Sequence, residues 1–202
     1  MKLYYASGAC SLAPHIALRE AGFSFELEKV DLASKQTESG ADFTKVNPKG
    51  YVPALKLDNG ETLTEVAVLL QYIADEKPDS GLAPQFGSME RYRLMEWLNF
   101  IATEIHKTLG AFFNPNITPE WKEFQLGTFN KRCVILAEQL DGKQYLLGDS
   151  FSIADAYLFT ILGWTRLHKI DMSKWPVLTD YMSQIAERPA VIEAMQKEGL
   201  RG

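Results

Sequence analysis

The pattern of hydrophobic and polar positions changes near residue 80. Before this point short apolar runs alternate with polar stretches, and their period changes repeatedly between that of a strand and that of a helix. The sequence Asp58-Asn59-Gly60 lies between two such runs and is a strong hairpin signal. This half predicts the order β-α-β-α-β-β-α. The expected strands are residues 2–5, 24–32, 52–57 and 62–63, and the expected helices are 11–21, 34–45 (weakly helical) and 65–74.

The first helix carries its own start and stop signals. With Ser11 as N-cap, Pro14 lies in the first turn, where the N–H that proline lacks has no intrahelical partner. Gly22 follows the last apolar position and predicts the end of the helix.

After residue 88 the pattern is helical throughout. Residues 77–88 hold two prolines, two glycines and two serines, a composition typical of a linker. One long helix is expected over 89–110, and a second over 118–141, opened by a threonine cap and a proline. Ser152-Ile153-Ala154-Asp155 resembles a capping box, and the apolar helix that it opens, through residue 167, is expected to be the buried axis of its domain.

These patterns predict an α/β domain followed by an all-α domain. The predicted division is 1–80 for the α/β domain, 81–88 for the linker and 89–202 for the helical domain. A chain of 202 residues can hold one large domain or two small ones, and either is long enough to bury a core.

Composition and charge exclude several classes of function. The net charge is −5, and no cluster of Lys and Arg interleaved with aromatic residues indicates a nucleic-acid binder. The longest apolar runs are shorter than the roughly 20 residues that cross a bilayer, and the first residues lack the pattern of a signal peptide. Two cysteines make no disulfide framework. We therefore expect a cytoplasmic protein without a membrane span, whose partners are small molecules or proteins.

Cys10 lies where the first strand passes into the first helix. Near a helix N-terminus, free N–H groups and the helix dipole stabilise a thiolate. The alternative is a small buried core cysteine, although Gly8 and Ala9 offer little bulk to cover it. A Cys-x-x-Cys dithiol is excluded, because Ala13 stands in the second position. Cys133, inside an amphipathic helix, is expected to be core.

A metal site is not expected. The two cysteines and three histidines show none of the paired spacings of zinc sites. His15 and His168 have no polar companions, so we expect them to be structural or exposed.

His106 has companions on its helix. Asn99, Thr103, His106 and Gly110 are spaced +4, +3 and +4, which places them on one face of an α-helix. Such a stripe is either solvated or the lining of a cleft, and docking of the first domain would favour the cleft.

Two further features also have two interpretations. Pro53 within a β run is either a plain edge-strand proline or the mark of an edge that pairs with a peptide-like ligand. Glu65, in the first turn of its helix, is either favoured by the helix dipole or directed at a ligand amine.

Together these features resemble the bacterial beta-class glutathione S-transferases, over essentially the whole chain. Four motifs in the same order carry the resemblance. They are Gly8-Ala9-Cys10-Ser11-Leu12, Asn47-Pro48-Lys49-Gly50-Tyr51-Val52-Pro53, Trp97-Leu98-Asn99-Phe100 with His106-Lys107, and Ser152-Ile153-Ala154-Asp155-Ala156-Tyr157-Leu158.

The resemblance implies a thioredoxin-like N-terminal domain that binds glutathione and a helical C-terminal domain that supplies most of the electrophile pocket. It also implies a homodimer, a cis peptide before Pro53, and glutathione as a co-substrate with no permanently bound cofactor. The implied catalytic residues are Cys10, which would face the glutathione sulfur, and Ser11 and His106 as donors to the ionised sulfur. The implied glutathione-binding residues are Cys10, Lys35, Val52, Pro53, Glu65, Val66, Asn99, Thr103, Glu104, Ile105, His106 and Lys107. Phe113, Tyr157 and Trp164 are the implied walls of the electrophile pocket.

In this pattern Val52 would pair with the cysteinyl backbone of glutathione, as a short added strand. Glu65 would meet the γ-glutamyl amine, and the Val66 N–H its carboxylate. Lys35 and Lys107 are cationic candidates for the glycyl carboxylate or for the rim of the site, and Asn99 would come from the neighbouring subunit. Val66 departs from the Ser or Gly of many relatives, which predicts about 0.5–1.5 kcal/mol weaker glutathione binding.

The resemblance implies an enzyme that activates the thiol of glutathione for attack on small hydrophobic electrophiles, with thiol-disulfide exchange or peroxidase activity beside it. Three alternatives stay open at this point. They are a thiol-disulfide oxidoreductase, a reductive dehalogenase, and a non-catalytic module that binds apolar ligands or proteins.

Overall fold

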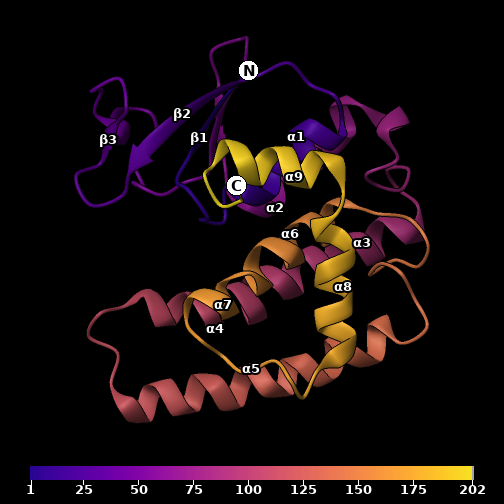
Figure 1. Cartoon of the computed structure of the whole chain (residues 1–202). Helices are drawn as coiled ribbons and strands as arrows, with labels where there is room; N and C mark the ends of the chain where they lie inside the picture. The colour runs from indigo at the N-terminus through magenta and orange to yellow at the C-terminus, as the bar shows by residue number, and fades with distance from the viewer. Residues whose placement is uncertain (202) are drawn as a thin grey trace. The chain divides into compact units, whose positions relative to one another are not determined.

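The computed structural model describes residues 1–201, which form two compact units (Figure 1). Unit 1 is Met1–Ala83 together with the described residues from Arg188 onward, and unit 2 is Pro84–Glu187. This division differs from the predicted domains at the C-terminus. There α9 (Pro189–Lys197) packs on α1 (Leu12–Glu20) and belongs to unit 1.

Unit 1 is built on a mixed five-stranded sheet of order β3-β2-β1-β4-β5. β1 pairs in parallel with β2, and the other neighbours are antiparallel. The thioredoxin-like fold is therefore confirmed. The strands are β1 (Lys2–Tyr5), β2 (Glu26–Asp31), β3 (Gln36–Thr37), β4 (Ala54–Lys56) and β5 (Thr62–Thr64), and the further helices are η1 (Phe43–Lys45), α2 (Val66–Glu76) and η2 (Pro78–Ser80).

The weak helix expected over 34–45 is wrong. This segment instead forms β3 and the single 3₁₀ turn η1. Within it Thr37 and Phe43 are buried, and Thr37 pairs with Val30 of β2. Pairing with the sheet edge satisfies the backbone where a short polar helix would have no apolar face to bury.

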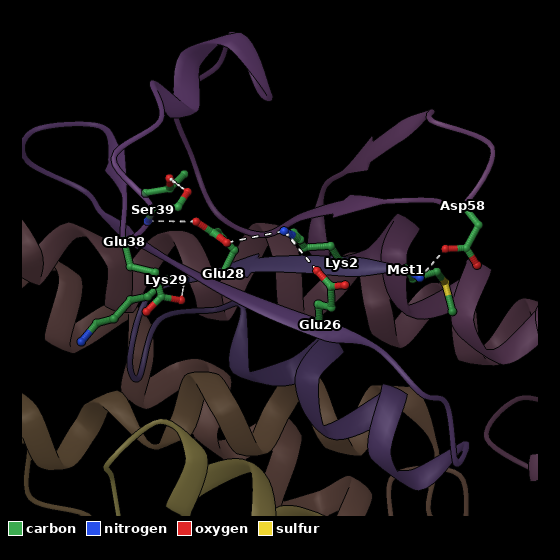
Figure 2. Close-up of polar contacts among 9 residues, drawn as sticks. Met1, Lys2, Glu26, Glu28, Lys29, Glu38, Ser39 and Asp58 are labelled. Carbon is green, nitrogen blue, oxygen red and sulfur yellow. Dashed lines mark hydrogen bonds and ion pairs between the residues drawn. The ribbon is translucent and has the colours of Figure 1, made fainter.

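Polar side chains fasten this segment to the sheet (Figure 2). The Ser39 N–H donates to the Glu28 carboxylate at 3.2 Å, and the Lys29 N–H donates to Glu38 at 3.0 Å. Glu28 also lies 3.6 Å from the ammonium of Lys2 on β1. The segment that carries Lys35 is thus tied to β2 through Glu38 and Ser39.

Unit 2 is all helical, as expected. Its long first helix is continuous but not uniform, because residues 101–106 form a π-helical turn. The helices are α3 (Met89–Phe100), the π-turn η3 (Ile101–His106), α4 (Lys107–Gly110), η4 (Ala111–Phe113), α5 (Pro119–Leu140), α6 (Ile153–Leu162), α7 (Trp164–Leu167) and α8 (Pro176–Ala186). No helix within residues 1–201 combines the length and hydrophobicity needed to span a membrane.

The capping box at Asp155 is confirmed, and α6 is buried along its whole length. The Asp155 carboxylate is fully buried and accepts from the backbone N–H groups of Leu146 and Ser152, each at 2.9 Å. It also accepts from the hydroxyls of Ser152 and Tyr181, at 2.7 and 2.9 Å. The helix ends at Leu162, earlier than expected, and continues after Gly163 as α7.

Candidate functional site

Cys10 lies on a turn between β1 and α1. Its thiol is half exposed and donates to the Val52 carbonyl at 3.3 Å. Gly8 in the same turn has φ +70°, a conformation that favours glycine. Because its thiol is partly exposed, Cys10 is not the buried core cysteine that the sequence left open as an alternative.

Ser11 holds this turn in a way that the sequence did not indicate. Its side chain makes no cap hydrogen bond to α1. The buried hydroxyl instead accepts from the Ala6 N–H at 3.1 Å and donates to the Ala6 carbonyl at 3.2 Å. Ser11 is the N-cap residue of α1, as expected, but its hydroxyl bonds to Ala6 instead of capping the helix, which gives it a structural role.

A second brace comes from the C-terminal end of unit 1. The buried Glu198 carboxylate accepts from the Gly8 N–H at 2.9 Å, and the Ser7 hydroxyl donates to the Glu198 carbonyl. The second carboxylate oxygen of Glu198 lies 2.8 Å from His15 Nδ1, and Arg19 Nε donates to His15 Nε2 at 2.9 Å. Since Nε2 accepts, Nδ1 carries the proton and donates to Glu198. His15 is structural, as expected.

Val52 and Pro53 border the Cys10 thiol. Their peptide bond is cis, as the resemblance implied, and both residues are buried. Val52 belongs to the same hydrophobic cluster as Ala6, and Ala9 packs against that cluster. The turn of Cys10 and the cis-proline turn therefore share one hydrophobic support.

Lys35 lies across the neighbouring loop. Its ammonium donates to the Gly50 carbonyl at 3.0 Å and lies 5.8 Å from the centre of the exposed Tyr51 ring. The half-buried Lys35 has φ 60°, which is uncommon for a residue with a side chain.

Glu65 precedes α2 with φ 72° and ψ 120°. Non-glycine residues held in such a conformation cluster at ligand sites. The exposed carboxylate lies 2.6 Å from the Lys49 ammonium, which also donates to the Thr64 hydroxyl at 3.1 Å. Val66 opens α2 and is buried, and the first N–H groups of a helix have no intrahelical partner.

His106 ends the π-turn of unit 2. Its Nδ1 lies 2.7 Å from the Tyr157 hydroxyl of α6, and its ring meets the Trp164 ring edge to face at 5.0 Å. The expected α-helical stripe does not hold across 101–106, because the π-turn changes the spacing of side chains. His106 and Gly110 still share a face, since a Cβ on Gly110 would lie 4.0 Å from His106 Cδ2.

The other predicted residues of this stretch differ in exposure. Asn99, Thr103 and Lys107 are exposed, and the Thr103 hydroxyl donates to the Asn99 carbonyl at 3.0 Å. Ile105 is fully buried. The Glu104 carboxylate pairs with Arg132 on α5 at 2.6 Å.

Two of the predicted pocket walls, Tyr157 and Trp164, contact the His106 ring, and the third, Phe113, contacts Trp164. Tyr157 and Trp164 are buried, whereas Phe113 is half exposed. The Phe113 ring meets Trp164 at 4.9 Å and His168 at 4.5 Å, each edge to face. His106 links the rings of Tyr157 and Trp164, and the series continues through Phe113 and His168 to Phe112, so it includes two residues, His168 and Phe112, that the sequence did not assign to it.

The predicted residues thus fall into two groups, one within each unit. Cys133 belongs to neither, because it is fully buried in α5 and burial raises its pKa to about 12. Among residues 1–201 no group of three or more His, Cys, Asp or Glu side chains is arranged to hold a metal ion. Lys49 lies within the second family motif but was given no role there, whereas Glu198 and Arg132 were not predicted and no local motif in the sequence marks them.

The family comparisons agree with this architecture. The family model "Glutathione S-transferase, N-terminal domain" matches residues 8–76, and "Glutathione S-transferase, C-terminal domain" matches residues 100–189. Glutathione S-transferase GstA of Escherichia coli O157:H7 is 45% identical over 201 residues, covering 100% of both chains. The chain therefore belongs to the glutathione S-transferase family.

Comparison with solved structures indicates the class of glutathione S-transferase to which the chain is most similar. A sphingomonad glutathione S-transferase complexed with glutathione is 50% identical with a TM-score of 0.95, covering 99% of this chain and 100% of that one. The bacterial beta-class glutathione S-transferase of Sphingomonas chungbukensis gives the same identity, TM-score and coverage. The resemblance to the beta class is confirmed.

Proposed function

We propose that this glutathione S-transferase activates the thiol of glutathione at the Cys10 turn for attack on small hydrophobic electrophiles. The observation that carries the proposal is the half-exposed Cys10 thiol, held 3.3 Å from the carbonyl that precedes cis-Pro53. Glutathione is the co-substrate. Its cysteinyl backbone pairs with the main chain of Val52, which brings its sulfur to Cys10.

The ends of glutathione are bound by charge. Glu65 takes the γ-glutamyl ammonium, and the N–H of Val66 at the start of α2 takes the γ-glutamyl carboxylate. Lys35 is the candidate for the glycyl carboxylate, with Lys107 as a second cation, and Pro53 fixes the turn. Asn99, Thr103, Glu104 and Ile105 complete the predicted glutathione-binding stretch.

His106 supports the ionised sulfur. Its Nδ1 is engaged with the Tyr157 hydroxyl, so a hydrogen bond to sulfur would come from Nε2. The glutathione thiolate attacks the electrophilic carbon, a carbon–sulfur bond forms, and the leaving group departs with its electron pair. Phe113, Tyr157 and Trp164 supply the apolar contacts for the electrophile. Ser11 takes part through the structure of the turn, because its hydroxyl is bonded to Ala6.

Thiol-disulfide exchange is the second candidate function, and the exposure of Cys10 favours it. The Cys10 thiolate attacks a disulfide that contains glutathione, and the partner thiolate leaves. A second glutathione thiolate then attacks the mixed disulfide, which releases oxidised glutathione and restores Cys10.

One set of variants tests both functions. Parent, Cys10→Ala, His106→Ala and Cys133→Ala are assayed with chlorodinitrobenzene for conjugation and with hydroxyethyl disulfide for exchange. We expect Cys10→Ala to abolish exchange, and His106→Ala to lower conjugation about ten- to two-hundredfold at neutral pH, with partial recovery at higher pH. Cys133→Ala is the matched control. Parental rates of conjugation in His106→Ala across the pH range would overturn its role, and retained exchange in Cys10→Ala would overturn that of Cys10.

The resemblance to the family also bears on the oligomeric state and the cellular location. We propose a cytoplasmic homodimer, and three exposed side chains of α3, Met89, Tyr92 and Met95, support an apolar contact with a second copy. Asn99 on the same helix would reach the neighbouring site. Light scattering of the purified protein tests the dimer, and a monomeric mass at micromolar concentration would contradict it.

A further inference from the structure

The π-turn of unit 2 carries the side chains that the proposed function places nearest to sulfur. Residues Ile101–His106 form this wider turn within an otherwise α-helical segment. Two threonine hydroxyls bond to main-chain carbonyls around it: Thr103 donates to Asn99 at 3.0 Å, and Thr108 donates to Glu104 at 2.6 Å. A π-turn is rare in α-helices and is frequent at functional sites.

The turn is fixed from one side by an ion pair with α5. Arg132 Nε lies 2.7 Å and its Nη2 lies 2.6 Å from the same Glu104 oxygen, so two donors of the guanidinium hold one acceptor. Both side chains are partly buried, 29% and 38% exposed, which screens the pair less than a fully exposed one. Arg132 lies 28 residues beyond Glu104 in the chain.

The same turn is fixed from the other side through His106. Its Nδ1 lies 2.7 Å from the Tyr157 hydroxyl, and Tyr157 is buried in α6. The buried Ile101 and Ile105 anchor the turn between these two contacts. The side chains of Glu104 and His106 therefore hold one π-turn between α5 and α6.

We propose that Arg132 is a positioning residue that fixes the π-turn through Glu104 and thereby the orientation of His106. The proposal rests on the proposed function for the role of His106, but not for the geometry of the turn. Loss of Arg132 leaves the partly buried Glu104 carboxylate without its two donors. The turn then relaxes toward α-helical spacing, which rotates His106 relative to Tyr157.

The chain offers matched variants for the test. Arg132→Met removes the charge but keeps much of the packing, whereas Arg132→Lys keeps the charge without the fork of donors. Lys131→Met removes the adjacent exposed positive charge and is the control. We compare kcat and KM for glutathione across pH, and we follow amide hydrogen exchange of residues 101–106.

We expect Arg132→Met to lower kcat by about tenfold, because a small misplacement of a catalytic group has large effects on rate. The acid limb of its profile of kcat against pH should move to higher pH, and amide exchange of the π-turn should accelerate. Arg132→Lys should recover part of the loss in kcat and part of the protection from exchange. Lys131→Met should match the parent. In the double variant with His106→Ala, Arg132→Met should cause little further loss, because both changes act on the same group.

Three results decide between the proposals. If Arg132→Met folds with parental kcat and parental exchange over 101–106, the positioning role is overturned. If His106→Ala keeps parental turnover, the proposed role of His106 fails, while faster exchange of the π-turn in Arg132→Met would still support the role of Arg132 in holding it. Full additivity in the double variant would also overturn the proposal, since it would show that Arg132 acts independently of His106.

Discussion

The two units hold their candidate residues by different means. In unit 1 the Cys10 turn is fixed mainly through its backbone: Gly8 N–H bonds to Glu198, and Ala6 bonds through both main-chain groups to Ser11. In unit 2 side chains bond to side chains, as in Glu104 with Arg132 and His106 with Tyr157. The bonds between Ala6 and Ser11 are local, whereas the bond from Gly8 to Glu198 and the contacts between side chains of different helices depend on how distant elements pack.

The two cysteines give the largest expected contrast between the units. We expect oxidation in the presence of glutathione to add one glutathione to Cys10 and none to Cys133. Cys10 is half exposed, whereas Cys133 is fully buried, and its pKa of about 12 leaves it almost entirely protonated at pH 8. Mass spectrometry of the intact protein and of its peptides measures the adducts. Equal modification of both, or of Cys133 alone, would contradict this contrast, and Cys10→Ser serves as the control that gains no adduct.

Asp155→Ala tests how far unit 2 depends on single side chains. It leaves four donors without their buried acceptor, so we expect the free energy of unfolding to fall by about 3–5 kcal/mol. Urea unfolding measures the loss. Asp155→Asn, which keeps the shape and one acceptor, should lose less. A variant that melts like the parent but has lost turnover would show that Asp155 acts in chemistry instead of in folding.

Glu198→Ala tests the corresponding brace in unit 1. It removes the acceptor of Gly8 and His15, so we expect a loss of about 2–4 kcal/mol in the free energy of unfolding. Glu193→Ala is the matched control, since its 61% exposed carboxylate forms only a surface pair with Arg19 and should change stability by less than about 1 kcal/mol. Equal losses in the two variants, measured by urea unfolding, would mean that the brace adds nothing beyond a surface charge.

The smallest expected effect concerns His168, whose ring contacts Phe112 and Phe113 in the aromatic series. Burial and the nearby Lys122 lower the pKa of His168 below 6.5. Because the pKa of His168 is lower in the folded than in the unfolded protein, the neutral imidazole favours folding at a pH above the unfolded pKa. This stabilisation is lost as the pH falls through the folded pKa. His168→Gln should therefore lose slightly less stability than the parent between pH 7 and pH 5. Thermal melting at both pH values measures the difference. An identical loss of stability in parent and variant would show that His168 does not contribute to the pH dependence of stability.

The sequence by itself determined the elements that have local signals. Thr118 caps α5 and Ser152 opens the capping box of α6 because a cap needs only residues within one turn. Gly60 closes its hairpin with φ 91°, a conformation that glycine adopts freely. The positions of Cys10 and Val52 on adjacent turns also follow from motifs, once the family pattern is recognised.

Only the tertiary structure decided the remaining features. β3 forms because β2 offers an edge with which to pair, and α9 belongs to unit 1 because its apolar face packs on α1. Glu198 meets His15 across 183 residues, and Arg132 meets Glu104 across 28. A single sequence carries no signal for such pairs, because their energy depends on which helices become neighbours and not on local spacing.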